Sequence, residues 1–178
     1  LGGDAAFDQL VAACRDMGLQ VMLDGVFNHV SRNHPAVQAA LDETAGRLNP
    51  ADNPWHGLVR AHVGDNGEPA LDVFEGHGDL VALDHSADET VDYVVHVMSH
   101  WLDRGAAGWR LDAAYAVPSP FWARVLPQVK AAHPYSWIFG EVIHGDYPRI
   151  IEESTMDSIT QYELWKSIQH ALETENFF

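Results

Sequence analysis

The sequence predicts an α/β fold with a parallel sheet. Short apolar runs alternate with longer segments whose apolar residues recur at helical spacing, which is typical of βα units. The runs are almost entirely apolar, as expected for strands whose two faces are both covered. Three of the runs end in an acidic residue, so the sequence also predicts that carboxylates gather at one edge of the sheet.

The first helix is expected to begin at Asp4, a good N-cap residue. Its apolar pattern includes the single cysteine, Cys14, which predicts a buried thiol and excludes an intramolecular disulfide. A short strand over residues 21–23 follows and ends at Asp24. From residue 26 to 84 the pattern breaks down into scattered Pro, Gly, Asn and His. We therefore expect a long loop or small subdomain, called the excursion below, over residues 26–84.

Regular structure is expected to resume near residue 86. Apolar residues at helical spacing, bounded by Ser, Gly and Pro, alternate again with short apolar runs. This pattern predicts helices at residues 86–105, 119–133, 146–153 and 162–172, and strands at residues 108–111, 136–140 and 158–160.

Composition narrows the possible partners. The chain has 178 residues, 47% of them hydrophobic, enough for one folded domain with a substantial core. A formal net charge of -16 argues against binding to nucleic acid or to an anionic membrane surface, and it is compatible with a neutral ligand such as a sugar. No apolar run approaches the ~20 residues that span a bilayer, and no signal peptide is present. We expect a cytoplasmic protein, although the absence of an initiator Met at Leu1 indicates a truncated N-terminus.

The acids at the strand ends suggest glycosidic bond chemistry. Asp24, Asp112 and Glu141 each follow an apolar run, and the carboxyl ends of parallel strands meet at one rim. Arg110 and Asp112 lie two residues apart and share a face, so Arg110 is expected to hold Asp112, and also Asp24, ionised. Glu141 has no adjacent Arg and follows an aromatic run, which predicts a protonated carboxyl. One ionised and one protonated carboxyl facing a cleft can cleave a glycosidic bond.

Two other interpretations of these residues remain open. An acid at the end of a strand can simply cap the next helix, and any one of the three could do only that. The chain also has eleven His, several of them in the excursion, but none has the i, i+4 spacing with Glu of a zinc protease.

Among the six Trp, Trp55 in the excursion is the best candidate for stacking against a sugar.

At these residues the chain resembles the α-amylase family of glycoside hydrolases. Residues 24–29 (DGVFNH), 108–114 (GWRLDAA) and 139–142 (FGEV) are similar to three conserved regions of that family, in the same order. Residues 78–86 resemble the stretch that leads from the excursion of that family into its fourth barrel helix.

The resemblance implies part of a (β/α)8 TIM barrel, about strands 3 to 6, with residues 1–178 forming a partial catalytic barrel and the excursion following strand 3. It implies a retaining hydrolase or transglycosylase acting on α-glucosidic bonds of α-glucans or α-glucosides. Asp112 matches the nucleophile, Glu141 the general acid/base and Arg110 the residue that orients the nucleophile. Asp24 and His29 match groups in the sugar subsite beside the scissile bond. The two catalytic carboxyls should then lie about 5–5.5 Å apart.

The sequence departs from the family in several places. No motif for the third catalytic acid follows Glu141, so we expect a partial barrel that is inactive alone and exposes edges through which it could self-associate. Many family members bind Ca²⁺ near the excursion. Asn28 matches one ligand, but Tyr115 and Ala116 stand where Lys and a ligand His are common. We therefore expect no cofactor, with Ca²⁺ through Asn28 as the alternative.

Two further function classes stay open at this stage. A non-catalytic relative could keep the barrel as a binding or interaction module. A metal-dependent barrel hydrolase could use the carboxylates and His as ligands. Stoichiometric transition metal in purified protein would favour the latter.

Overall fold

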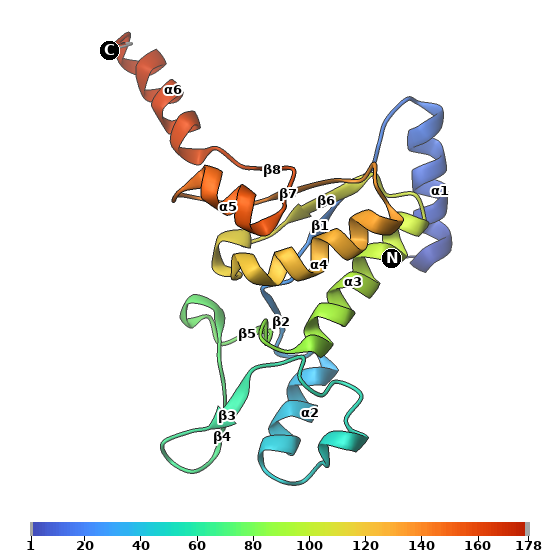
Figure 1. The fold of residues 1–178 in the computed structure, drawn as a ribbon, viewed down its shortest axis with the longest axis vertical. Coiled ribbons are helices and arrows are strands. Elements are labelled where there is room, and N and C mark those ends of the chain that lie inside the picture. Colours follow the sequence, from blue (N-terminus) through green and yellow to red (C-terminus); the bar gives the residue numbers. More distant parts are fainter. Residues whose placement is uncertain (1, 177–178) are drawn as a thin grey trace.

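The computed structural model describes residues 2–176, and its centre is a four-stranded parallel sheet with strand order β1-β6-β7-β8 (Figure 1). The predicted α/β fold with a parallel sheet is confirmed, and the strands and helices outside the excursion lie within a few residues of their expected positions. The strands are β1 (Met22–Gly25), β6 (Gly108–Leu111), β7 (Trp137–Gly140) and β8 (Ser158–Ile159). The accompanying helices are α1 (Gly3–Asp16), α3 (Asp88–Asp103), α4 (Ser119–Ala132), α5 (Tyr147–Ser154) and α6 (Tyr162–Thr174).

Helices cover one face of the sheet and leave the other face open within residues 2–176. Trp109, Leu111 and Ile138 point to the covered face and are buried in the main core with α3 and α4. On the opposite face, Met22 is 40% exposed and Trp137 is 52% exposed. The prediction that both faces are covered is therefore wrong for the described residues. An all-apolar run does not reveal which partner segments are present to cover it.

Helix α1 packs against α3 along a narrow contact. Phe7 meets Trp101 edge to face, with ring centroids 4.8 Å apart. Only Val11 of this helix is buried, and the Cys14 thiol, which we expected in the core, is half-buried. Gly2 rather than Asp4 occupies the N-cap position, and the Asp4 carboxylate lies within the first turn. The predicted apolar face of α1 is present, but the neighbouring elements cover only part of it.

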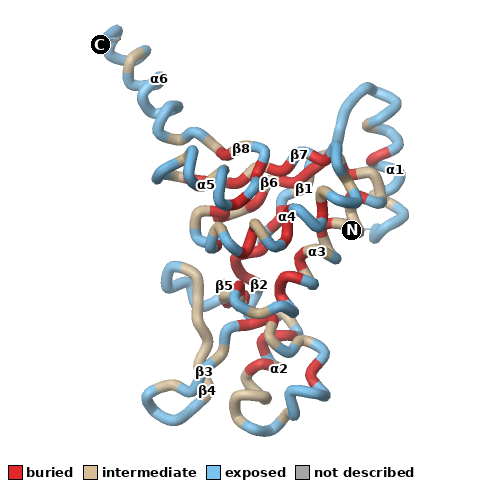
Figure 2. The backbone as a smooth tube through the Cα atoms, viewed as in Figure 1, coloured by how far each residue is buried: buried red, intermediate tan, exposed pale blue. Residues whose placement is uncertain are grey.

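The excursion has regular structure and a core of its own (Figures 1 and 2). Strands β2 and β5 form one antiparallel pair, and β3 and β4 form another. The buried residues of this second core are Ala36, Val37, Ala40, Leu58, Val59, Val81 and Leu83. The elements are β2 (His29–Ser31), α2 (Pro35–Thr44), η1 (Pro50–Asp52), β3 (Ala61–Val63), β4 (Pro69–Leu71), η2 (Phe74–Gly76) and β5 (Leu80–Ala82).

The strand register brings the sequence-predicted acids to one edge of the sheet. Asp24 of β1 lies opposite Arg110 of β6, and Leu111 lies opposite Gly140 of β7. The residues that follow Leu111 and Gly140, namely Asp112 and Glu141, are therefore neighbours at the carboxyl ends of adjacent parallel strands. The amide of Glu141 donates to the carbonyl of Leu111 (2.9 Å), which continues the ladder up to the acids.

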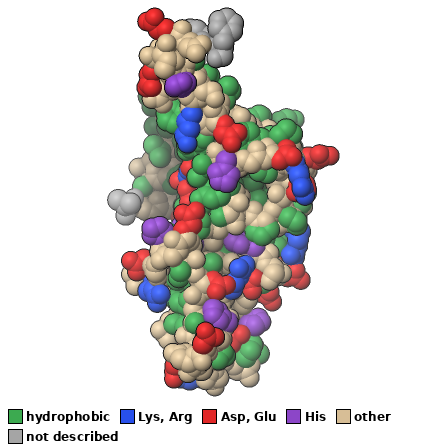
Figure 3. Space-filling model, turned by 90° about the vertical axis from the view of Figure 1, so that its left-hand side faces the viewer, with side chains coloured by type: hydrophobic (Ala, Val, Ile, Leu, Met, Phe, Trp, Pro, Cys, Tyr) green, Lys and Arg blue, Asp and Glu red, His purple; other side chains and the backbone are tan. Residues whose placement is uncertain are grey.

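Figure 3 shows how charged side chains are distributed on one face of the molecule. Acidic side chains are spread along the face drawn in Figure 3 instead of forming one patch. Among the described residues, no helix combines the length and the apolar character needed to cross a membrane.

Candidate active site

A single guanidinium links the three acids at the edge of the sheet. Arg110 Nη1 donates to Asp24 Oδ1 and to Asp112 Oδ1, each at 2.7 Å, and Nη2 lies 2.8 Å from Glu141 Oε1. The contacts with Asp112 and Asp24 are those that the strand pattern predicted. Because both nitrogens belong to one planar group, the Asp112 and Glu141 carboxylates lie within the span of one side chain.

The predicted setting of Glu141 is wrong. We expected this carboxyl to lack a cationic neighbour, but it pairs with Arg110 and is only 16% exposed. The sheet register explains the contact, because Arg110 lies beside Phe139 on β7 and its side chain extends toward the end of that strand. Spacing along one strand could not show that the Arg of one strand reaches the acid of the next.

Two more donors hold the Glu141 carboxylate. The backbone N–H of Ala113 donates to Oε2 (3.1 Å), and the Tyr162 hydroxyl donates to Oε1 (3.0 Å). Ala113 has φ 46°, a left-handed backbone conformation that is unfavourable for a residue with a Cβ. Such strain persists where the surroundings fix it, and it is frequent at functional sites. Here it accompanies the turn that follows Asp112 and directs an N–H at Glu141.

The neighbouring carboxylates keep Arg110 charged. The hydrogen bond with Asp24, followed by the one with Asp112, raises the pKa of Arg110, against the opposing effect of burial. The Tyr162 hydroxyl donates a hydrogen bond to the Glu141 carboxylate, and this bond raises the pKa of the hydroxyl. Tyr162 therefore remains a hydrogen-bond donor to Glu141 at neutral pH.

His29 lies near Asp112, on the excursion side of the site. Its ring stacks on Phe74 with centroids 5.0 Å apart and an interplanar angle of 19°. Burial lowers the pKa of His29, and the negative charge of Asp112 opposes that shift. The predicted site residues Asp24, His29, Arg110, Asp112 and Glu141 are thus brought together at one end of the sheet.

Trp55 lies elsewhere. Its indole packs on the second core, edge to face with His34 (centroids 5.1 Å apart) and Tyr93 (6.5 Å). No contact links Trp55 to the acids among the described residues. Its place within the excursion could not be inferred from sequence because it depends on how α2 and α3 pack around it.

Comparisons with known proteins show which proteins this chain is similar to. The family description "Alpha amylase, catalytic domain" matches residues 1–69. A cyclomaltodextrinase from a Bacillus species is 27% identical over 168 residues, which cover 94% of this chain and 30% of that protein. A solved cyclomaltodextrinase structure superimposes with a TM-score of 0.76 at 26% identity, over 93% of this chain and 28% of that one. The chain is therefore similar to part of the catalytic domain of the α-amylase family.

The match is to part of an α-amylase family catalytic domain. A cyclic maltosyl-maltose hydrolase from Arthrobacter globiformis shares the fold with a TM-score of 0.78 at 24% identity, covering 94% of this chain and 37% of that one. The chain therefore spans about a third of the solved structures, and under a third of the curated relatives, that it matches.

The α-amylase family resemblance raised Ca²⁺ bound through Asn28 as an alternative. Asn28 lines a small cavity together with Arg60, Glu75 and His85, so a guanidinium, a carboxylate and an imidazole all border it. The Asn28 amide contacts His29 Nδ1 at 3.1 Å. Asp72, one of the possible oxygen donors, lies near Arg60 instead, at 3.6 Å. Ca²⁺ requires six to eight oxygen ligands, and no group of three acidic, His or Cys side chains is placed to share an ion within residues 2–176.

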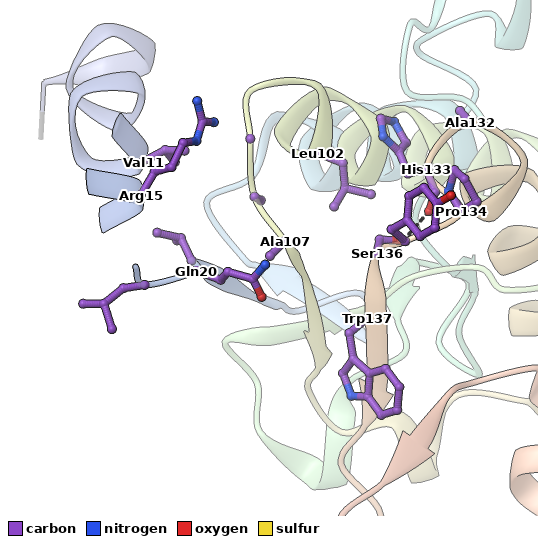
Figure 4. A pocket seen from close by; sticks show the side chains of 15 residues that line it. Val11, Arg15, Gln20, Leu102, Ala107, Ala132, His133, Pro134, Ser136 and Trp137 are labelled. Atoms are coloured by element: carbon purple, nitrogen blue, oxygen red, sulfur yellow. Dashed lines mark hydrogen bonds between the residues drawn. The ribbon is translucent and has the colours of Figure 1, made fainter. Parts of the chain in front are cut away.

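A cavity of about 510 Å³ lies at the opposite end of the sheet (Figure 4). Its lining comes from the amino ends of β6 and β7 and from α1. The larger polar and aromatic side chains of the lining are Arg15, Gln20, His133, Tyr135 and Trp137. It contains no carboxylate. The acids therefore lie at the carboxyl ends of the strands, and the larger opening lies at the amino ends.

Sequence reasoning missed several residues at the site. Tyr162 was assigned only to the start of a helix, and Tyr115 was noted only because Lys is common there. Glu75, which accepts a hydrogen bond from the Tyr115 hydroxyl at 3.0 Å, was not considered. The one available signal was the position of Tyr115, three residues after the strand-end acid Asp112. A sequence pattern alone cannot show which acid each hydroxyl contacts.

Proposed function

We propose that the full-length protein carrying this chain is a retaining hydrolase or transglycosylase of α-glucosidic bonds in oligo- or polysaccharides. The observation that supports it is the position of Arg110, which joins Asp112 and Glu141 at the carboxyl ends of adjacent parallel strands. Two carboxyls so close that one side chain spans both suit a double-displacement mechanism. The similar hydrolase from Arthrobacter globiformis is recorded in complex with cyclic maltosyl-maltose, which supports an α-glucan as the substrate class.

In the proposed reaction Asp112 attacks the anomeric carbon while Glu141 donates its proton to the glycosidic oxygen. The carbon–oxygen bond breaks, the leaving sugar departs with that proton, and a glycosyl-enzyme forms on Asp112. Glu141 then takes a proton from water or from a sugar hydroxyl. The resulting nucleophile displaces Asp112 and gives hydrolysis or transfer respectively.

The surrounding residues have supporting roles in this proposal. Arg110 orients Asp112 and maintains its charge through their 2.7 Å contact. Asp24 and His29 bind hydroxyls of the sugar whose bond is cleaved. Residues 1–178 supply about strands 3 to 6 of a (β/α)8 barrel, and the excursion forms one wall of its mouth. A third catalytic acid would come from another part of the protein.

Substitution of the two acids tests the proposal. In the full-length protein, Asp112→Asn should abolish cleavage of both maltose and aryl α-glucosides, because no covalent intermediate can form. Glu141→Gln should slow maltose cleavage by about 100-fold to 10,000-fold, the usual contribution of acid–base catalysis. It should slow cleavage of α-glucosyl fluoride far less, because fluoride leaves without protonation.

A matched control is Glu153→Gln, which alters an exposed carboxylate of α5 that pairs with Arg149. It should leave all rates unchanged. Mass spectrometry after reaction with a slowly turned-over fluorosugar should locate the sugar on Asp112. Sugar binding without cleavage by the wild-type protein would instead identify a non-catalytic relative, and near wild-type turnover by Asp112→Asn would reject the assigned nucleophile.

A further inference from the structure

The turn η2 of the excursion is fixed beside the acids by two independent contacts. The Phe74 ring stacks on His29, and the next residue, Glu75, accepts a hydrogen bond from the Tyr115 hydroxyl at 3.0 Å. Tyr115 comes from the short helix η3 (Ala114–Ala116) that follows Asp112. The excursion and the catalytic edge of the sheet are therefore joined through side chains at the site itself.

The backbone conformation of Glu75 indicates that contacts around this residue hold it in place. Its φ of 48° and ψ of 32° are left-handed, a conformation that residues other than Gly, Asn and Asp seldom adopt. A Glu remains in this conformation only where contacts around it outweigh the strain. The stacked Phe74 and the hydrogen bond to Tyr115 are those contacts, and together they turn the Glu75 carboxylate toward Tyr115.

Tyr115 lies on the side of the site where Glu141 is. Its backbone N–H donates to the Glu141 carbonyl oxygen at 3.2 Å. Burial, then the contact with Glu75 and the charges of Glu141 and Asp112, raise the pKa of the Tyr115 hydroxyl. The hydroxyl is therefore neutral at physiological pH, and it can donate to Glu75 and accept from a ligand at once.

We propose that Glu75 and Tyr115 bind a hydroxyl of the sugar on the leaving-group side and so set the preference for that sugar. This inference rests on the proposed function, in which Glu141 protonates the leaving oxygen and the leaving sugar consequently lies beside Tyr115. Glu75 is exposed and hydrogen-bonds Tyr115 among the described residues, which leaves its carboxylate further acceptor capacity. A sugar hydroxyl is a neutral donor, and a hydrogen bond to an ionised acceptor is stronger than one to a neutral acceptor.

The experiment compares two substrates in the full-length protein. Maltose places a glucose unit on the leaving side, whereas an aryl α-glucoside places no sugar there. Glu75→Gln and Tyr115→Phe should each lower kcat/KM for maltose by about tenfold, mainly through KM, and change that for the aryl glucoside by less than about twofold. The double variant should lose little more than either single variant because both residues act through one contact. Glu68→Gln, an exposed carboxylate in the β3–β4 hairpin, is the control.

The outcomes separate this inference from the proposed function. An equal loss on both substrates would mean that the pair only supports the fold, and no loss on either would mean that it does not contact the sugar; each result overturns the inference. Calorimetry with maltose in an Asp112→Asn background gives a second readout that needs no catalysis. If Glu75→Gln weakens maltose binding about tenfold, the sugar contact of Glu75 and Tyr115 is supported even where the proposed hydrolase activity is not found. If binding is unchanged, the inference is overturned even where that activity is confirmed.

Discussion

The substitution Arg110→Lys should separate the charge of the linking residue from its shape. A Lys ammonium is a single point charge and cannot reproduce the planar fork that reaches Asp24, Asp112 and Glu141 together at 2.7–2.8 Å. We expect the Lys ammonium to keep its contact with one of the three carboxylates and to lose the contacts with the other two. A charge-assisted hydrogen bond contributes about 1.5–3 kcal/mol, and the lower value suits a side chain that is 27% exposed. Two lost contacts then amount to about 3 kcal/mol, or about 100-fold in kcat/KM.

Initial rates on maltose and on an aryl α-glucoside, measured in the full-length protein, test this magnitude. The value of kcat/KM should fall by the same factor for both substrates, because Arg110 acts on the groups that react and not on the leaving sugar. Arg149→Lys is the matched control, since Arg149 is exposed on α5 and pairs with Glu153. Thermal unfolding of both variants checks that the fold is retained. A rate for Arg110→Lys within threefold of wild type, in a folded protein, would refute the idea that one planar group must hold all three acids.

Three other changes have distinct expected outcomes. Tyr162→Phe removes a hydroxyl that donates to Glu141 at 3.0 Å, so kcat should fall severalfold while the melting temperature stays unchanged; an unaltered rate would deny Tyr162 a part in the reaction. Burial lowers the pKa of His85 below 6.5, so the unfolded chain takes up the proton more readily and stability should fall as pH drops below about 6.5. His85→Gln should flatten this dependence, measured as melting temperature from pH 7.5 to 5. Gly108→Ala would place a Cβ against the backbone of Trp137 on the neighbouring strand, so it should destabilise the fold by at least ~2 kcal/mol in denaturant titrations.

The parallel sheet and its edge of acids were predictable because they depend on local pattern. Each strand is a short apolar run that ends in an acid, and adjacent parallel strands bring such ends together whatever lies between them. The alternation of residues along a strand also placed Arg110 and Asp112 on one face. The positions of the strands and helices outside the excursion followed from the same periodicities, with errors of only a few residues at their ends.

The setting of individual side chains was less predictable because it depends on contacts between distant segments. The approach of Arg110 to Glu141 requires the register of β6 against β7, which no single strand specifies. The burial of Trp55 depends on how the excursion folds around its own core. The open face of the sheet depends on segments outside the four strands. In each case the residue type was correctly noted, but its neighbour came from elsewhere in the chain.

The sheet register sets both the fold and the site, and this gives the predictions a common test. A slip of one residue between β6 and β7 would turn Arg110 from the open face, where the acids lie, to the face covered by α3 and α4. Changes within the strands, such as Gly108→Ala, should therefore reduce stability and activity together. Changes above the strand ends, at Tyr162 or Glu75, should reduce activity without loss of stability, because the ladder that aligns the acids stays intact. If the two kinds of variant behaved alike, the acids would not owe their arrangement to the strands that carry them.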